Sequence, residues 1–253
     1  MKGTGFAALA VTAWLSGCGG SDVDRGPLVP LEGKLNQPGD YAVTYEPAVT
    51  QSVTFQSGAG TQNRQYTGTS LYDLLSKAGI TVDPAIRNDA LNRYVIVTGS
   101  DGYRSVHALG EINPDFGNRP SLVAWAETVN GVSTPLTGDG PIRTTSPGDV
   151  RGGRYVSNVV KIELQASEST LAGSGGGQST QFTAGGPVAL RPGSYDLAAL
   201  QALPVTSVTV NGSTYTGVNL WTFVNTVIGL VSLGLGPARV ARAASGPVVE
   251  ARS

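Results

Sequence analysis

The chain has 253 residues, with 17 basic side chains, 18 acidic ones, one histidine and one cysteine. Because charge is sparse and balanced, the composition argues against an electrostatic partner such as nucleic acid, and we expect no nucleic-acid binding. A single cysteine excludes an intrachain disulfide and leaves no second thiolate for a metal or a nucleophile. The 35 glycines and 15 prolines stand among many Val, Thr and Tyr residues, which predicts an α+β protein that is mainly β.

An apolar stretch at the N-terminus predicts export. It runs from Phe6 to Leu15 and is short of the ~20 residues that a membrane-spanning helix needs. The following Leu15-Ser16-Gly17-Cys18 resembles the lipobox of bacterial lipoproteins, in which small residues admit a peptidase and the cysteine thiol takes up a diacylglycerol. The resemblance implies that residues 1–17 are a lipoprotein signal peptide and that Cys18 is lipidated. A plain secretory signal, with Cys18 incidental, is the alternative.

The segment after the signal predicts a flexible tether over residues 18–30. Gly19 to Pro30 is rich in Gly, Asp, Pro and Ser and offers little to bury. We therefore expect an exported protein that its lipid anchors in the bacterial cell envelope. Gly19 directly after the lipidated cysteine is compatible with sorting to the outer membrane, facing the periplasm. The membrane, reached through Cys18, is thus the first expected partner.

Residues 31–166 contain frequent strand patterns and are predicted to form the first domain. Branched and aromatic residues cluster between turn residues in these predicted strands: 41–45, 52–56, 94–98, 103–108, 121–128, 142–145 and 155–164. Asn130-Gly131 predicts a hairpin turn because both residues tolerate positive φ, and Asp101-Gly102 predicts another.

Two helices are predicted between these strands. The first is capped by Thr69-Ser70 and ends at Gly79. Its apolar residues share one face: Leu71, Leu74, Leu75 and Ala78. Pro84 begins the second helix. Its apolar residues are Ile86, Ala90 and Leu91.

A second copy of the first domain is predicted beyond a Gly/Ser-rich linker at residues 167–180. Three short signatures recur there in the same order. The matched pairs are Pro38-Gly39-Asp40-Tyr41 with Pro192-Gly193-Ser194-Tyr195, Ser52-Val53-Thr54 with Ser207-Val208-Thr209, and Tyr66-Thr67-Gly68 with Tyr215-Thr216-Gly217. We therefore predict a truncated repeat over residues 181–235. Chance similarity of β-rich turns is the alternative.

The end of this repeat is open to a second interpretation. Residues 218–235 are nearly apolar, so a transmembrane helix is an alternative to the soluble helix that the repeat predicts. Residues 236–253 are rich in Ala, Arg and Gly and are predicted to be a disordered tail. An out-of-frame change in a complete second domain would account for the truncation.

Three segments of the first domain form an ordered set. They are Tyr66–Leu75 with Gly79, Tyr94-Val-Ile-Val-Thr-Gly-Ser-Asp-Gly-Tyr103, and Gly140–Asp149 followed by Arg151-Gly-Gly-Arg-Tyr-Val156. Together they resemble the molybdopterin-dependent oxidoreductases whose founding members are the sulfite oxidases, over about 100 of the 253 residues. The resemblance implies a sulfite-oxidase-like molybdopterin-binding domain fold, mainly β, that grips a pyranopterin with backbone amides and basic side chains.

Two groups that the family uses for chemistry are missing from this chain. Family enzymes place a cysteine thiolate on molybdenum, and the matching region contains no cysteine. Catalytic members follow the Pro-Gly loop with a Val-Lys-Trp-like stretch, where this chain has Val156-Ser157-Asn158. Molybdopterin is thus a cofactor implied by the resemblance alone. We expect no bound cofactor, no catalytic residue and no metal ligand.

The candidate binding site is the loop Pro147–Arg154 together with the residue Arg143 before it. Its glycines allow backbone N–H groups to turn inward as an anion-binding nest: Gly148, Gly152 and Gly153. Its guanidinium groups match phosphate or carboxylate geometry: Arg143, Arg151 and Arg154. The alternative is that Asp149 pairs with an arginine and the glycines only shape a hairpin.

His107, the one histidine, is added to the candidate ligand-binding set. It alternates with Tyr103 and Ser105 on one face of a short strand, and an imidazole can move protons near neutrality. The alternative is a structural histidine, which the lack of a second His or a free Cys favours.

These observations lead to the hypothesis of an envelope-tethered lipoprotein whose molybdopterin-oxidoreductase-like domain is a non-catalytic module. Its expected partner is an anionic small ligand or an envelope protein. The alternative is a periplasmic molybdopterin-dependent oxidoreductase with unusual metal ligation. A purely structural surface lipoprotein is the third possibility.

Overall fold

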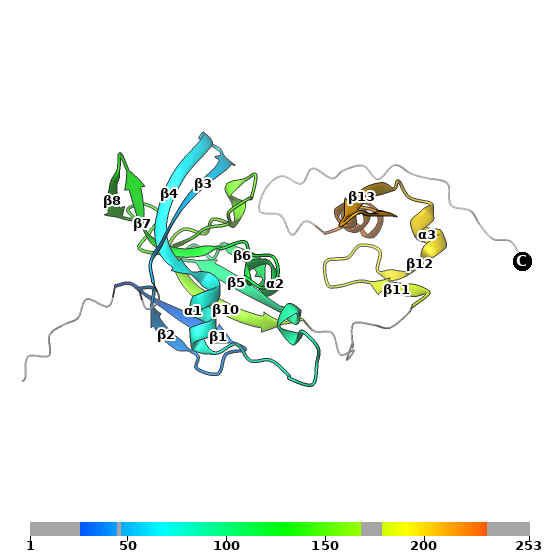
Figure 1. Cartoon of the computed structure of the whole chain (residues 1–253), viewed down its shortest axis with the longest axis horizontal. Coiled ribbons are helices and arrows are strands. Elements are labelled where there is room, and N and C mark those ends of the chain that lie inside the picture. Colours follow the sequence, from blue (N-terminus) through cyan, green and yellow to red (C-terminus); the bar gives the residue numbers. More distant parts are fainter. Residues whose placement is uncertain (1–25, 45–46, 168–178, 232–253) are drawn as a thin grey trace, which may run out of the picture. The chain divides into compact units, whose positions relative to one another are not determined.

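The computed structural model of the chain describes residues 26–44, 47–167 and 179–231. The chain divides into two compact units, Met1–Ser174 and Gly175–Ser253, and the division falls within the predicted linker (Figure 1). The predicted signal peptide, Cys18, most of the tether and linker, and the C-terminal tail lie outside the described residues.

The first unit contains two sheets. One has the strand order β2-β1-β10-β5-β6, with β1 at Leu28–Gly33, β2 at Gly39–Ala42, β5 at Arg93–Gly99, β6 at Arg104–Ala108 and β10 at Val159–Ala166. The pairing of β1 with β10 is parallel, and the other neighbours are antiparallel. The sheet therefore joins the first strand of the unit to its last.

The second sheet of this unit has the order β3-β4-β7-β8, and β9 also pairs with β7. Its strands are β3 at Val49–Ser57, β4 at Gly60–Ser70, β7 at Leu122–Val129, β8 at Val132–Pro135 and β9 at Arg143–Thr144. The helical elements of the unit are α1 at Leu71–Ala78, η1 at Asp89–Asn92, α2 at Leu109–Ile112 and η2 at Gly152–Arg154.

The predicted β-rich class is confirmed, and most predicted strands overlap with observed ones. Three strands were not predicted: β1, β4 and β8. The β1 strand begins at Leu28, inside the range predicted as tether, and its Val29 and Leu31 are fully buried. The predicted strand 155–164 begins later, because η2 and a turn precede Val159. The predicted Asn130-Gly131 turn joins β7 to β8, with both residues at positive φ.

The first predicted helix is confirmed as α1. Ser70 Oγ accepts a hydrogen bond from Asp73 N–H, and Gly79 follows the helix at φ 78°. The second predicted helix is wrong, since only the 3₁₀ turn η1 forms there. Asn88 adopts a left-handed φ of 54°, which interrupts a helix begun at Pro84.

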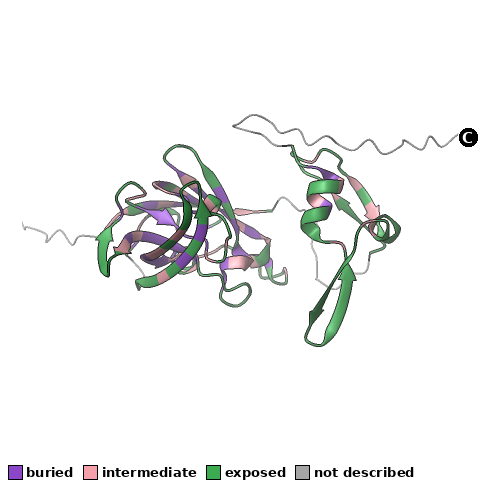
Figure 2. Cartoon of the chain, turned by 90° about the horizontal axis from the view of Figure 1, so that it is seen from above, coloured by how far each residue is buried: buried purple, intermediate pink, exposed green. Residues whose placement is uncertain are grey.

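The core of the first unit lies where α1 packs on the β1-β10-β5 sheet. The four apolar residues of α1 are fully buried and meet sheet residues such as Val29, Val97 and Ile162. A smaller cluster lies on the other sheet: Val53, Phe55, Tyr66, Leu122, Ala124, Leu136 and Tyr155. Figure 2 shows buried residues throughout this unit, whereas exposed residues dominate the second.

The second unit contains two hairpins and a helix in the same order as the first elements of the first unit, with the additional helix α3 between the hairpins. Its elements are β11 at Gln181–Ala184, β12 at Gly193–Asp196, α3 at Leu197–Gln201, β13 at Thr206–Val210, β14 at Ser213–Gly217, α4 at Leu220–Thr222 and the π-helix η3 at Phe223–Ile228. The hairpin β11-β12 corresponds to β1-β2, and β13-β14 corresponds to β3-β4.

Individual hydrogen bonds recur between the two copies. Tyr41 Oη donates to Gln37 O at 2.8 Å, and Tyr195 Oη donates to Arg191 O at 3.1 Å. The β-bridge of Leu35 with Ile80 returns as that of Ala189 with Leu230. The cap of Ser70 on Asp73 N–H returns as that of Asn219 on Thr222 N–H. The tyrosine hydrogen bonds and the helix caps are local contacts, whereas the β-bridge joins residues distant in sequence in both units.

The register of the hairpins corrects one matched signature. Thr50 lies opposite Thr67 with their hydroxyl oxygens 2.9 Å apart, and Ser207 lies opposite Thr216 at 2.8 Å. Ser207 therefore corresponds to Thr50 rather than to Ser52. Because the difference is two residues, the correction does not change which residues share a face of the hairpin.

The helix of the second copy contains one more residue than α1. The shift between the copies is 149 positions from Ser70 to Asn219 and 150 positions from Gly79 to Gly229. The π-helix η3 lies between these points, and a π-turn accommodates a single extra residue. No helix in the described part of the chain is long and apolar enough to cross a membrane.

Candidate functional site

The predicted Arg-Gly loop connects β9 to β10 through η2. It starts from Arg143 on β9, passes Gly148 and reaches Arg154 at the end of η2. The three arginines of this region have different surroundings.

Arg154 is held by two carboxylates. Its Nε and Nη2 donate to Asp149 Oδ2 and Oδ1 at 2.8 and 2.6 Å, and its Nη1 and Nη2 donate to Glu111 Oε2 and Oε1 at 2.9 Å. A fifth, longer bond runs from Nη1 to Val106 O at 3.5 Å. Since a guanidinium has five N–H donors, no donor of Arg154 is left for a ligand.

The pKa values of this cluster follow from its pairing. Hydrogen bonds to Asp149 and Glu111 raise the pKa of Arg154. The hydrogen bond from Arg154 holds the pKa of Glu111 below its usual value. Arg119 also forms an ion pair with Glu111 at 3.6 Å. The cluster therefore contains two cations and two anions, and its charges are balanced by one another.

Arg143 is buried and also paired. It forms an ion pair with Asp139, and its guanidinium carbon lies 5.6 Å from the ring centre of Tyr66 and 5.8 Å from that of Tyr155. Its Nε has no hydrogen-bond partner in the described part of the chain. Asp139 already gives this guanidinium an anionic partner.

Arg151 differs from the other two arginines. Its side chain is exposed and has no hydrogen bond or ion pair with any described residue. Its backbone forms a parallel bridge with Gln56, which attaches the loop to β3. Of the predicted arginines, this one alone keeps its donors for solvent or a ligand.

The loop glycines meet close neighbours or adopt turn conformations. A Cβ at Gly152 would lie 2.7 Å from the ring of Phe55, and Gly148 has a φ of 86°. Gly153 O accepts a hydrogen bond from Tyr103 Oη at 2.6 Å. These contacts account for the glycines through packing and turn geometry.

His107 is buried beside this cluster. Its side chain lies on the inward face of β6 with that of Ser105, whose Oγ is 3.3 Å from His107 Nε2. The predicted third member of this face, Tyr103, is instead exposed. Burial, together with the nearby charge of Arg154, lowers the pKa of His107 to about 4, so the imidazole is neutral near pH 7.

Sequence reasoning missed the residue that connects these groups. Glu111 lies on α2, 43 positions before Arg154, and bonds it in a bidentate manner. The elements β6, α2 and η2 are in contact in the structure, through the side chain of Arg154, but η2 is distant from the other two in the sequence. The pairing of Asp149 with an arginine, by contrast, is the alternative that the sequence had already offered.

This donor set fits a molybdopterin poorly. The group carries a phosphate and needs a soft ligand for its metal. The site instead contains two carboxylates, Asp149 in the loop and Glu111 on α2, and two of its arginines are already paired. Among the described residues, no group of three or more His, Cys, Asp or Glu could hold a metal ion.

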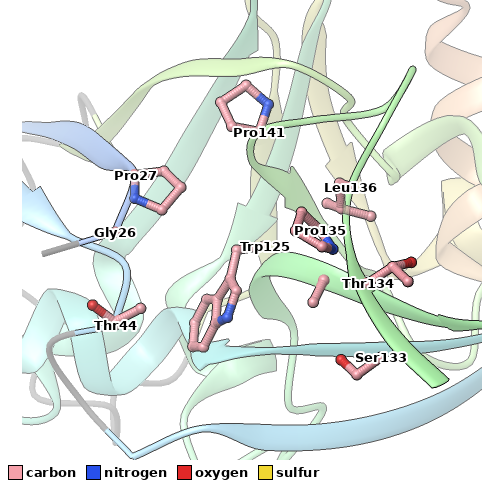
Figure 3. Close-up of a pocket in the computed structure, with 10 residues that line it drawn as sticks. Gly26, Pro27, Thr44, Trp125, Ser133, Thr134, Pro135, Leu136 and Pro141 are labelled. Carbon is pink, nitrogen blue, oxygen red and sulfur yellow. The ribbon is translucent and has the colours of Figure 1, made fainter. Parts of the chain in front are cut away.

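A pocket of about 460 Å³ lies in the first unit between the start of β1 and the β7-β8 hairpin (Figure 3). The indole of Trp125 faces it, and the described residues that line it are uncharged. They are Gly26, Pro27, Thr44, Trp125, Ala126, Ser133, Thr134, Pro135, Leu136 and Pro141. This volume is within the range of small-molecule sites, and the lining suits a neutral, largely apolar ligand.

Comparison with known protein families gives no match, and comparison with curated proteins gives none either.

The two neighbouring arginines of the loop provide a matched test of these contacts. We expect Arg154→Met to lower the free energy of unfolding by about 2 kcal/mol, because Glu111 and Asp149 lose their shared partner and repel each other. Arg151→Met, at an exposed and unpaired side chain, should change it by less than about 0.5 kcal/mol. Urea titration at pH 7 measures both, and equal effects would contradict the assigned pairing.

His107 predicts a pH dependence of stability. Its pKa is about 4 in the folded chain and ordinary, about 6.5, in the unfolded chain. Between these values the unfolded chain binds the extra proton, so stability falls as pH decreases from 6.5 to 4. We expect His107→Gln to remove about 2 kcal/mol of the difference in unfolding free energy between pH 7 and pH 4.5. Urea titrations at both pH values measure this, and an unchanged pH dependence would contradict it.

Proposed function

We propose that the chain is an envelope-tethered lipoprotein and that its first unit is a non-catalytic, ligand-binding module on a molybdopterin-oxidoreductase-like scaffold. The observation that carries the proposal is the contrast between the two regions of this unit. The charged groups of the Arg-Gly loop are bonded to one another, whereas the pocket at Trp125 is open and lined by uncharged residues.

The scaffold part of the proposal rests on the three segments that resemble the family. They fall on the β4-α1 junction, on β5 with its turn, and on β9 with η2. All three lie in the first unit and adjoin either its main core or its charged cluster. This arrangement is compatible with one inherited domain whose cofactor loop has been converted to internal ion pairs.

The ligand part of the proposal concerns the pocket. Trp125 and the prolines Pro27, Pro135 and Pro141 offer rigid apolar surfaces, and Ser133 and Thr134 add hydroxyl groups at the β8 side. A neutral compound with an aromatic or aliphatic body and one or two polar atoms would match this lining. The predicted anionic ligand would be left with the side chain of Arg151 alone.

The tether is tested by Cys18→Ser in the natural bacterial host. We expect the wild-type chain to fractionate with membranes and its N-terminal peptide to carry the added mass of an acyl-glyceryl group. The Cys18→Ser chain should lose both properties because the thiol is the attachment atom. A wild-type chain with an unmodified Cys18 would overturn this part of the proposal.

The pocket is tested with Nile red, a neutral dye whose fluorescence rises in apolar surroundings. We expect saturable binding to the full chain that Ser133→Arg weakens at least tenfold, because the arginine places charge and volume in the pocket. Val132→Arg, on the neighbouring exposed residue outside the lining, is the matched control. Equal binding by both variants would contradict the assigned site. Stoichiometric molybdenum in protein purified from the envelope would instead favour an oxidoreductase.

A further inference from the structure

The second unit contains a hairpin whose outer edge is unpaired. Within the described residues β14 pairs only with β13, whereas β4, its counterpart, pairs with both β3 and β7. We propose that β14 accepts an extended segment of another protein, which pairs antiparallel with it as β7 pairs with β4. This inference concerns the second unit alone and does not depend on the ligand proposed for the first.

The exposed side chains of β14 and the following helix support the proposal. Tyr66 on β4 is 1% exposed, but its counterpart Tyr215 is 61% exposed. Leu71, the first residue of α1, is 0% exposed, but its counterpart Leu220 is 75% exposed. In the first unit β7 contributes to both coverings, since Leu122 and Ala124 share a buried cluster with Tyr66 and Val123 shares another with Leu71. The preceding Ser121 O also accepts the backbone N–H of Leu71.

One face of the hairpin β13-β14 is suited to burial. Val208 and Val210 lie on the same face as Tyr215, and all three are at least half exposed. The opposite face carries hydroxyl groups that bond across the hairpin, between Ser207 and Thr216 and between Thr209 and Thr214. The hairpin is therefore amphipathic, with its apolar face uncovered by any described residue of the second unit.

A glycine marks the position that the incoming backbone would approach. A Cβ added at Gly68 would lie 2.5 Å from Ala124 Cα and from Val123 O, so the close passage of β7 requires a glycine there. Its counterpart on β14 is Gly217, and nothing described lies within 4 Å of a Cβ at that position. The second copy has thus kept the residue that permits close approach of a strand.

The charges of the second unit define the chemistry of the segment it would accept. Arg191 and Asp196 are its only charged side chains among residues 179–231, and both are engaged: Arg191 donates to Val227 O and Thr226 O, and Asp196 accepts from Ala199 N–H. The matching segment is a strand with uncharged, branched or small apolar residues at alternate positions. The sequence of β7, Leu-Val-Ala-Trp-Ala-Glu-Thr-Val, is an example with one charge near its end.

Two other occupants match these features less well. Residues 232–253 include three arginines, and their only adjacent branched pair is Val248-Val249. A second copy of this chain could offer its own β14, which has five residues against the eight of β7, and it would add no counterpart to Ser121. A strand from another protein can supply both the pairing and the covering side chains.

The experiment uses a synthetic peptide of residues Ser121–Val129, with two lysines added at each end and a fluorescent label. Fluorescence anisotropy should show saturable binding to the full chain. We expect Gly217→Val to weaken this binding at least tenfold, because its side chain blocks the approaching backbone. Thr214→Val, on the hydroxyl face of the same strand, should change it less than twofold.

Further measurements separate the other outcomes. Gly217→Val should leave the thermal unfolding midpoint unchanged, because the space around it is open. Peptide that binds wild type and Gly217→Val equally, or binds neither, overturns the proposal. A dimer that Gly217→Val dissociates, seen by analytical ultracentrifugation, overturns it in favour of a second copy. Peptide binding that appears only in a chain ending at Val231 overturns it in favour of residues 232–253.

Discussion

The parallel pairing of β1 with β10 is the interaction on which the first unit depends. It brings the first and last strands together, and α1 packs its apolar face on the sheet that results. The second copy retains the hairpins and the helix of this arrangement, but its described residues include no counterpart of β10 or β7. Tyr215 and Leu220 are exposed where their counterparts are buried, although several local hydrogen bonds recur.

The chemistry of the first unit follows from how its charges are distributed. Most of the charged groups near the Arg-Gly loop satisfy one another, since Arg154 bridges Asp149 and Glu111 and Arg143 pairs with Asp139. Removing one partner of such a pair leaves a partly buried charge without its counterion, which is destabilising. The buried, neutral His107 is part of the same arrangement. The pocket at Trp125, which has no charged lining residue among those described, is therefore the more suitable place for a ligand.

Local signals in the sequence predicted local structure well. The cap at Ser70, the glycine after Ala78 and the Asn130-Gly131 turn depend on a few adjacent residues, and each is observed. The strand β4 was missed because its exposed first half is polar, and its place is determined by pairing with β3 and β7. The helix expected after Pro84 fails because Asp89 is used in a buried ion pair with Arg93 and Asn88 turns the chain.

The candidate site was also predicted only as far as its local residues allow. The arginines and glycines of the loop could be found from sequence, but Glu111 comes from an element 43 positions away, and nothing in its neighbours indicates the contact. The repeat was visible as three short signatures, while its register required the paired hydroxyl groups of the two hairpins. Long-range pairing was therefore the information that the sequence lacked.

The π-helix η3 accommodates one residue more than α1 between the same kinds of helix end. One additional residue rotates every later side chain of an ordinary helix by about 100°, which would turn a buried face toward solvent. Here Phe223 and Ile228 are both buried, and Gly229 still ends the helix as Gly79 does. The wider turn thus absorbs a change of chain length within one element, so that mutation can lengthen this helix while the flanking connections keep their original phase.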